Sequence, residues 1–510
     1  MKLAAIYTRL DDAANPIAVK ELRQAVRSKL IASMIVLFLL IQFSVIGIMI
    51  AFQSPYSSYD YSMGSSAFVT LFTILQIACI IFVPMYTGSR MMFERVGVDI
   101  DLTYITTLSP GSVVAGKFFS GLVLIIVIYS ACVPFVTFTY FLRGIDLPTI
   151  AVMLGVGLVI GAVALMFSVL VGSIPASRPM RGLLALFKLG VLVSIVSWMM
   201  TIYADFQYGY SGSSYGNGFI FWVLGISAAL IAVLYILSTA LIAPPSSNRA
   251  FPVRVMMTAL WLVTGAAAFI QYFVAKPHGW NLTEYIEAWV YVFAACFCLG
   301  FLGAISERSG FPPRIRRLIP RRAALRRLSF LFFSGPVGGM LWAASSIVAT
   351  IAVFFAFASI HDPASITYSY DIPIEQVSVL ASAALYLIAY SLTGVYVRRR
   401  FLARFVPEDY TWVIALIALA IGSVVPSLIG VIWSTAYVDV YTSSYTREPT
   451  SWFITNPFAL SSYRELAVSS VMLSAAYAVL MYFLNLPWLR AQAALFKPME
   501  KAEALPEDEQ

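Results

Sequence analysis

Twelve apolar stretches of about twenty residues recur along this 510-residue chain, and they restrict its fold more than any other feature. A helix needs about 20 apolar residues to cross about 30 Å of hydrocarbon, so each stretch predicts one membrane-spanning helix. The predicted spans are 30–52, 67–87, 118–142, 150–174, 182–204, 219–242, 255–275, 288–305, 337–360, 377–397, 412–436 and 466–486. The eighth is short and is predicted to be an imperfect span. Only 11% of the residues are charged, so a water-soluble fold is excluded.

The distribution of Lys and Arg predicts the orientation of these spans. With the N-terminus inside and twelve alternating spans, almost all basic residues fall on the inner side. The exceptions are Arg143, Lys276, Arg447 and Arg464 in outer loops and Lys188 within the fifth span. A missed or extra span would reverse every later loop and spoil this partition. We therefore expect an all-α polytopic integral membrane helix bundle, with both termini in the cytoplasm.

The predicted organisation has two halves of six spans each. A cytoplasmic segment covers 1–29, the first half 30–242, a cytoplasmic linker 243–254, the second half 255–489 and a cytoplasmic tail 490–510. The first span is longer than the core of a signal peptide and lacks a clear cleavage site, so we expect it to be retained. Pro84, Pro134, Pro336 and Pro426 are predicted to kink their helices as packing features.

Residues suited to catalysis or metal binding are scarce. The four cysteines lie in apolar runs and the two histidines near outer loops, which predicts neither a disulfide framework nor a metal site. The run from Gly111 to Lys117 matches a phosphate-loop pattern, but Phe118 stands where magnesium binding needs Ser or Thr. We expect no cofactor, no catalytic residue and no nucleotide site. No acid or histidine lies near the middle of a span, which disfavours ion-driven transport.

The segment before the first span predicts an amphipathic helix that lies at the inner membrane interface. Asn15 is a suitable N-cap and Pro16 suits the first turn. The apolar arc would hold Ala18, Val19, Leu22, Ala25, Val26 and Leu30. The polar arc would hold Lys20, Glu21, Arg23, Gln24 and Arg27. An ordinary flanking anchor for the first span is the alternative.

Two inner loops predict contacts with partners. Residues 90–117 mix both charge signs with Met, Phe, Leu, Tyr and Ile, which favours docking on a protein partner or on the membrane surface. The loop between the eighth and ninth spans carries Arg308 and seven arginines within 314–327. Such blocks attract anionic lipid, and docking of a cytoplasmic partner can coexist with it. Nucleic-acid binding is not expected, because no soluble domain would present bases to aromatic side chains.

Several short motifs follow one another in a characteristic order. They are Asn15-Pro16, Lys20-Glu21-Leu22-Arg23, Glu94-Arg95, Leu108-Ser109-Pro110, Gly116-Lys117 and Asn456-Pro457-Phe458. In this order they resemble the permease subunit of an ABC exporter of the type-two class. The resemblance is best over residues 1 to about 240, and the chain departs from the usual six spans by having about twelve. Residues 250–510 would be a diverged second half, with Glu307-Arg308 paralleling Glu94-Arg95, although little residue identity links the halves.

The resemblance implies a permease in the bacterial inner membrane that exports an unidentified substrate. A separate ABC ATP-binding subunit, in two copies, would dock on the inner loops and the N-terminal helix, and the chain could form a homodimer. The implied docking residues are Glu21, Arg23, Arg90, Glu94, Arg95, Asp101, Thr107, Lys117, Glu307, Arg314, Arg316 and Arg317. The alternatives are an ATP-independent secondary carrier or flippase, a membrane scaffold subunit, and, more weakly, a membrane-embedded enzyme.

Overall fold

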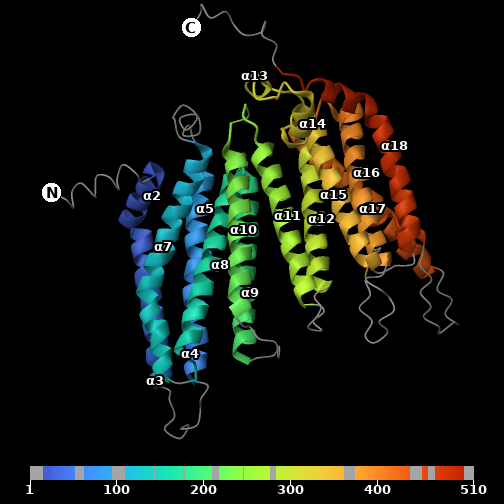
Figure 1. The fold of residues 1–510 in the computed structure, drawn as a ribbon. Coiled ribbons are helices and arrows are strands. Elements are labelled where there is room, and N and C mark those ends of the chain that lie inside the picture. The colour runs from blue at the N-terminus through green and yellow to red at the C-terminus, as the bar shows by residue number, and fades with distance from the viewer. Residues whose placement is uncertain are drawn as a thin grey trace, which may run out of the picture. The chain divides into compact units, whose positions relative to one another are not determined.

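The computed structural model of the chain is a set of long helices (Figure 1). It describes residues 15–51, 63–94, 109–142, 144–175, 178–208, 217–244, 246–275, 283–360, 374–436, 451–457 and 466–498, and these contain no strand. Within them, 12 helices are long and apolar enough to cross a membrane. The predicted all-α polytopic helix bundle is therefore confirmed, and the chain is a multi-pass membrane protein. It divides into two compact units, Met1–Pro244 and Pro245–Gln510.

Unit 1 contains the first six candidate spans. Its elements are α2 (Pro16–Arg27), α3 (Lys29–Ala51), α4 (Met63–Gln76), η1 (Ile77–Phe82), α5 (Val83–Glu94), α7 (Pro110–Phe138), η2 (Thr139–Leu142), α8 (Leu147–Ser173), α9 (Arg178–Tyr208) and α10 (Asn217–Ile242). The core lies where α4, α7 and α8 meet, with Phe68, Phe72, Ile125 and Leu165 fully buried. Because consecutive spans alternate in direction, α2, the end of α5 and the start of α7 lie at one end, which we call the basic end of unit 1.

Small residues let α5 and α8 approach closely near this end. A Cβ atom at Gly172 of α8 would lie 2.5 Å from the carbonyl oxygen of Gly88 and 2.9 Å from the Cβ of Met91. A Cβ at Gly88 would overlap the Oγ and the carbonyl oxygen of Ser168. Association of helices in lipid depends on such close van der Waals contact, because burying apolar surface gains little there. This contact therefore fixes α5, whose last residue is Glu94, against α8.

A π-helical segment interrupts the second span directly before Pro84. Elements α4, η1 and α5 form one continuous span, and η1 covers Ile77–Phe82. Proline has no N–H to donate to the preceding turn, so the local hydrogen-bond pattern must change there. The carbonyl oxygen of Pro84 accepts a hydrogen bond from the Oγ of Ser168 on α8. Ser168 thus adds a polar contact between α8 and the irregular part of the second span.

Unit 2 contains the other six candidate spans. Its elements are α11 (Ala250–Ala275), α12 (Thr283–Ala304), α13 (Pro313–Arg316), α14 (Ala323–Phe332), α15 (Pro336–Ile360), α16 (Ile374–Val397), η4 (Arg398–Leu402), η5 (Glu408–Tyr410), α17 (Thr411–Ala436), η6 (Ser451–Thr455) and α18 (Ala467–Ala494). Phe297, Trp342 and Ala343 lie in its main core between α12 and α15. The end at which α12 and α18 finish is the basic end of unit 2.

Two local predictions about the spans were wrong. The eighth span is not imperfect, because α12 has 22 residues and begins at Thr283, ahead of Glu284 and Glu287. The two glutamates had placed the predicted start too late, although the ends of a span tolerate charge. Pro336 does not kink a helix, because it is the first residue of α15, where its missing N–H is not needed. Pro134 and Pro426 do lie inside helices.

Candidate functional site

The N-terminal helix α2 is held against the start of α7 at the basic end of unit 1. The Asn15 side chain caps α2 by accepting from the backbone N–H of Ile17, at 3.0 Å. Its Nδ2 donates to the carbonyl oxygen of Ser112 in α7, at 2.6 Å. A Cβ at Gly116 would lie 2.8 Å from the Cβ of Ile17, so glycine is what permits this close approach. The cap therefore starts α2 and also attaches it to α7.

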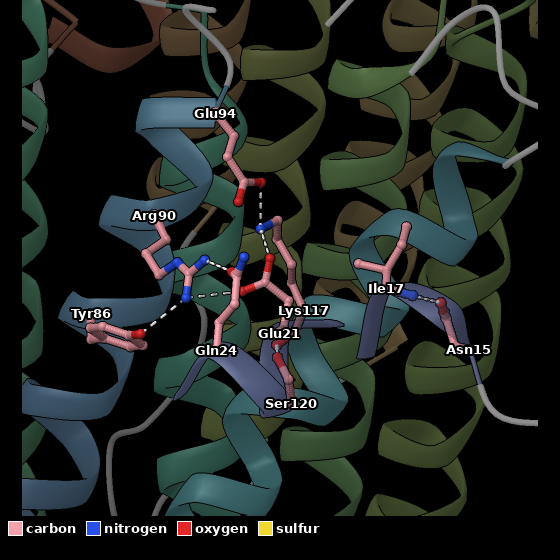
Figure 2. Close-up of polar contacts among 9 residues, drawn as sticks. All are labelled: Asn15, Ile17, Glu21, Gln24, Tyr86, Arg90, Glu94, Lys117 and Ser120. Atoms are coloured by element: carbon pink, nitrogen blue, oxygen red, sulfur yellow. Dashed lines mark hydrogen bonds and ion pairs between the residues drawn. The ribbon is translucent and has the colours of Figure 1, made fainter. Parts of the chain in front are cut away.

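Lys117 lies at the centre of the site and joins three segments (Figure 2). Its Nζ is 2.8 Å from Oε1 of Glu21 in α2 and 2.6 Å from Oε2 of Glu94 at the end of α5. The side chain is only 2% exposed, so the ammonium group depends on these carboxylates for its solvation. Two acidic partners from two different elements thus surround one buried cation.

Arg90 forms the second basic group of the cluster. Its guanidinium lies 3.6 Å from Oε2 of Glu21, donates to the Tyr86 hydroxyl at 3.0 Å, and also donates to Oε1 of Gln24. Figure 2 shows the side chain of Arg90 on α5 lying next to Glu21 and Gln24 on α2. Burial by itself would raise the pKa of Glu21, but Lys117 and Arg90 hold the pKa below its ordinary value. Glu21 is therefore a buried carboxylate stabilised in its charged form.

The cluster closes the base of the segment that precedes the third span. Glu94 is the last residue of α5 and Lys117 lies two turns into α7, so their ion pair joins the two stems of this segment. Glu21 ties both stems to α2 through Lys117 and Arg90. A displacement of the segment would therefore act on α2, α5 and α7 together, because ion pairs link all three helices.

The helical-wheel prediction for α2 needs correction. Glu21 was assigned to the polar arc, yet Glu21 and Ala25 are the two residues of α2 that are buried. A helical wheel sorts the residues of one helix by polarity, so it cannot include Lys117, which belongs to another helix. The pairing with Lys117 turned the charged position inward.

Substitution of Gly116 by valine should detach α2 from α7. The added side chain would collide with Ile17 and with the backbone of α2, which cannot yield as the end of a flexible side chain can. We expect faster backbone hydrogen exchange across residues 17–27, measured by mass spectrometry on the protein in micelles. Gly182→Val is the matched control, since nothing lies within 4 Å of a Cβ there. Unchanged exchange in Gly116→Val would contradict the described docking.

Unit 2 has a different arrangement at its basic end. Arg254, near the start of α11, pairs with Glu307 and donates to the carbonyl oxygens of Leu331 and Phe333, at 3.1 and 2.5 Å. The backbone N–H of Gly335 donates to Glu307 at 2.5 Å. Burial raises the pKa of Glu307, although Arg254 and this N–H favour the charged form. Glu307 lies just after the second span of unit 2, whereas Glu94 is the last residue of the second span of unit 1. The partner of Glu307 comes from the first span of its unit, whereas Lys117, the partner of Glu94, comes from the third.

A second group at this end ties η5 to the loop after α12. Asp409 lies 3.4 Å from Arg308, and Glu408 lies 3.6 Å from Arg398. The Oε2 of Glu408 also accepts from the backbone N–H of Ser309, at 2.8 Å. The backbone N–H of Trp412 donates to the Oγ of Ser306, at 3.0 Å. These contacts hold the loop after α12 against the start of α17.

The short element η6 packs against tyrosines of α16 at the other end of unit 2. The hydroxyls of Tyr386 and Tyr390 donate to the carbonyl oxygens of Ile454 and Thr455, at 2.9 and 3.4 Å. The Nδ2 of Asn456 donates to the Oγ of Ser427 in α17, at 2.9 Å. Asn456 belongs to the predicted Asn-Pro-Phe motif. The motif thus begins in a turn that is fixed by side chains of two spans.

The structure brings four of the predicted docking residues together: Glu21, Arg90, Glu94 and Lys117. Arg23 is exposed on α2, and Arg314 and Arg317 are exposed in unit 2, where Arg316 is half-buried. Arg95, Asp101 and Thr107 lie outside the described residues. Sequence reasoning missed Arg254, which it had placed in a linker one residue before the seventh span. Arg254 lies alone at the edge of an apolar run, whereas the loop arginines are clustered. This isolated position was the signal that could have indicated a buried role.

Among the described residues, no group of His, Cys, Asp and Glu is arranged to hold a metal ion. The chain was also compared with known proteins. No family model, curated protein or solved structure matches it.

Proposed function

We propose that this chain is the permease subunit of an ATP-driven ABC exporter in the bacterial cytoplasmic membrane, powered by a separate ATPase chain. The order of its sequence motifs supports this proposal, as does the presence of six candidate spans in each unit. The observation that carries it is the position of Lys117. Its ion pairs with Glu21 and Glu94 link the N-terminal helix to both stems of the segment at which the resemblance places the ATPase.

The proposed role of the cluster is mechanical. A partner that closes on ATP would push segment 95–108 and α2, both of which would face the cytoplasm. Loose stems would absorb such a displacement locally, whereas stems joined by ion pairs pass it on to the spans. The tight α5–α8 contact at Gly88 and Gly172 would carry it further into unit 1. The permease itself performs no bond chemistry in this scheme.

The geometry divides the docking candidates into two groups. Glu21 and Lys117 are buried and paired within the chain, so they act as positioning residues for the surface that the ATPase would contact. Arg23 is exposed on α2 and remains a candidate for direct contact, together with Arg95, Asp101 and Thr107. Glu94 belongs partly to both groups, since it pairs with Lys117 while its side chain is 35% exposed.

The native protein should co-purify with an ATP-binding protein, and Asp101→Lys should abolish this association. A charge reversal within segment 95–108 would repel a partner surface that attracts Asp101, without touching the described ion pairs. The measurement is affinity purification from membranes in mild detergent, with partners identified by mass spectrometry. Asp146→Lys is the control, because Asp146 is exposed at the opposite end of unit 1.

Two results would contradict the proposal. Recovery of the ATPase with Asp101→Lys at the level of the parent protein would remove the docking surface from segment 95–108. Substrate movement in purified vesicles that follows an ion gradient without any ATPase would replace the ABC permease by a secondary carrier.

A further inference from the structure

A dense group of arginines lies at the basic end of unit 2. We call it the arginine surface, and its members are Arg314, Arg316, Arg317, Arg321, Arg322, Arg326 and Arg327. All are exposed except Arg316 and Arg326, which are half-buried. They lie in and between α13 and α14, at the same end as the C-terminal end of α18 (Figure 1). The Nε of Arg316 is buried and has no hydrogen-bond partner among the described residues.

The carboxylates beside the arginine surface are already engaged elsewhere. Glu307 pairs with Arg254, Glu408 with Arg398 and Asp409 with Arg308. Among the described residues, no ion pair involves any member of the arginine surface. Of the other acidic residues that the structure describes in unit 2, Glu284 and Glu287 lie in the first turns of α12 and Glu375 lies in the first turn of α16, at the opposite end of this unit. Several like charges within one short segment repel each other, so this surface favours an acidic ligand.

The chain that follows α18 is anchored within the same loop. Phe496 is 7% exposed, and its ring contacts those of Phe311, Phe330 and Phe333 at centroid distances of 5.2, 5.1 and 5.5 Å. Phe330 belongs to α14, and Ile315 of α13 lies in the same cluster. The backbone therefore leaves α18 directly beside the arginine surface, two residues before Pro498.

Residues 499–510 have the complementary charge. They contain Glu500, Glu503, Glu507, Asp508 and Glu509 against the single basic residue Lys501. An extended chain spans about 3.3–3.6 Å per residue, so this tail reaches about 40 Å from its start. Helix α14 has ten residues and is about 15 Å long, which is within that reach.

We propose that the acidic tail 499–510 binds the arginine surface of its own chain. Anchoring by Phe496 makes the contact intramolecular, with an effective concentration of about a millimolar or more. Each surface ion pair is weak alone and is screened by salt, but several carboxylates act on one tethered segment. The bound tail shields the arginine surface from anionic lipid headgroups and from an acidic partner. Binding of the tail to this surface does not require that an ATPase drives the protein.

Neutralising the tail should expose the arginine surface to trypsin, which cleaves after arginine. In nanodiscs of phosphatidylcholine, the full-length variant Glu503→Gln/Glu507→Gln/Asp508→Asn/Glu509→Gln should be cleaved faster at Arg314, Arg317 and Arg322. An effective concentration about tenfold above the dissociation constant predicts an acceleration of about tenfold. Cleavage is quantified by peptide mass spectrometry relative to Arg27, an exposed site in unit 1. Sodium chloride at about 1 M should have the same effect on the parent protein, since the Debye length falls to about 3 Å.

Lys501→Gln is the matched control, because it changes one tail charge in the opposite sense and should leave cleavage equally slow or slower. Equal cleavage of the parent and the neutralised variant in phosphatidylcholine would overturn the proposal. The proposal would also be overturned if the arginine surface were protected from trypsin only after phosphatidylglycerol is added, to the same extent in the parent and the neutralised variant. Anionic lipid would then be the ligand of this surface. The melting temperature of each variant, measured in the same nanodiscs, separates loss of tail binding from unfolding of the loop.

Discussion

Replacement of Lys117 by methionine should be the most disruptive single change at the basic end of unit 1. Methionine keeps the length and apolar stem of lysine but leaves the buried carboxylate of Glu21 without its nearest cation. Removing one partner of a buried ion pair costs about 3–5 kcal/mol, since the remaining charge stays desolvated. We expect a loss of this size in the free energy of unfolding, measured by titration with sodium dodecyl sulfate in mixed micelles.

A double variant separates the ion pair from simple loss of packing. Lys117→Met with Glu21→Gln removes both charges, so it should recover most of the stability lost by Lys117→Met alone. The control is Arg23→Met, at an exposed position of α2, which should change the free energy of unfolding by no more than about 0.5 kcal/mol. If the double variant were as unstable as Lys117→Met, the stabilisation would come from the shape of the lysine rather than from its pairing with Glu21.

Replacement of Gly172 by valine should separate α5 from α8. Its first added carbon would lie 2.5 Å from the carbonyl oxygen of Gly88, and backbone atoms cannot rotate away as a side chain can. Overpacking usually costs about 1–3 kcal/mol, and a clash with backbone should reach at least the top of that range. The same unfolding titration measures the loss, and a fall in the amount of folded protein recovered from membranes should accompany it.

Helix α8 itself provides the control for this substitution. A Cβ at Gly155 meets nothing within 4 Å, so Gly155→Val adds the same side chain to the same helix without a clash. We expect Gly155→Val to leave the stability within about 1 kcal/mol of the parent protein. Equal losses at Gly155 and Gly172 would show that valine acts through helix propensity, and the close α5–α8 contact would then not be the cause.

Sequence determined the architecture because a bilayer imposes a length and a polarity on each span. The twelve apolar runs recur as twelve candidate spans, and α2 begins where Asn15 and Pro16 predict. The ends of spans were less predictable. Helices such as α7 and α9 continue beyond their apolar cores, since backbone hydrogen bonding does not stop where hydrocarbon does. The glutamates at the start of α12 hid the first turns of this helix from the hydrophobic pattern for the same reason.

Only the tertiary structure decided which charges are buried and with whom. Glu21, Glu94 and Lys117 were each singled out as surface docking residues, yet Lys117 and Glu21 form a buried pair across 96 positions of sequence. Arg254 looked like a linker residue and proved to hold Glu307. The hydrophobic pattern of a span depends only on the residues of that span, so the span can be predicted from the sequence alone. An ion pair between distant helices depends on how those helices pack, which no local pattern records.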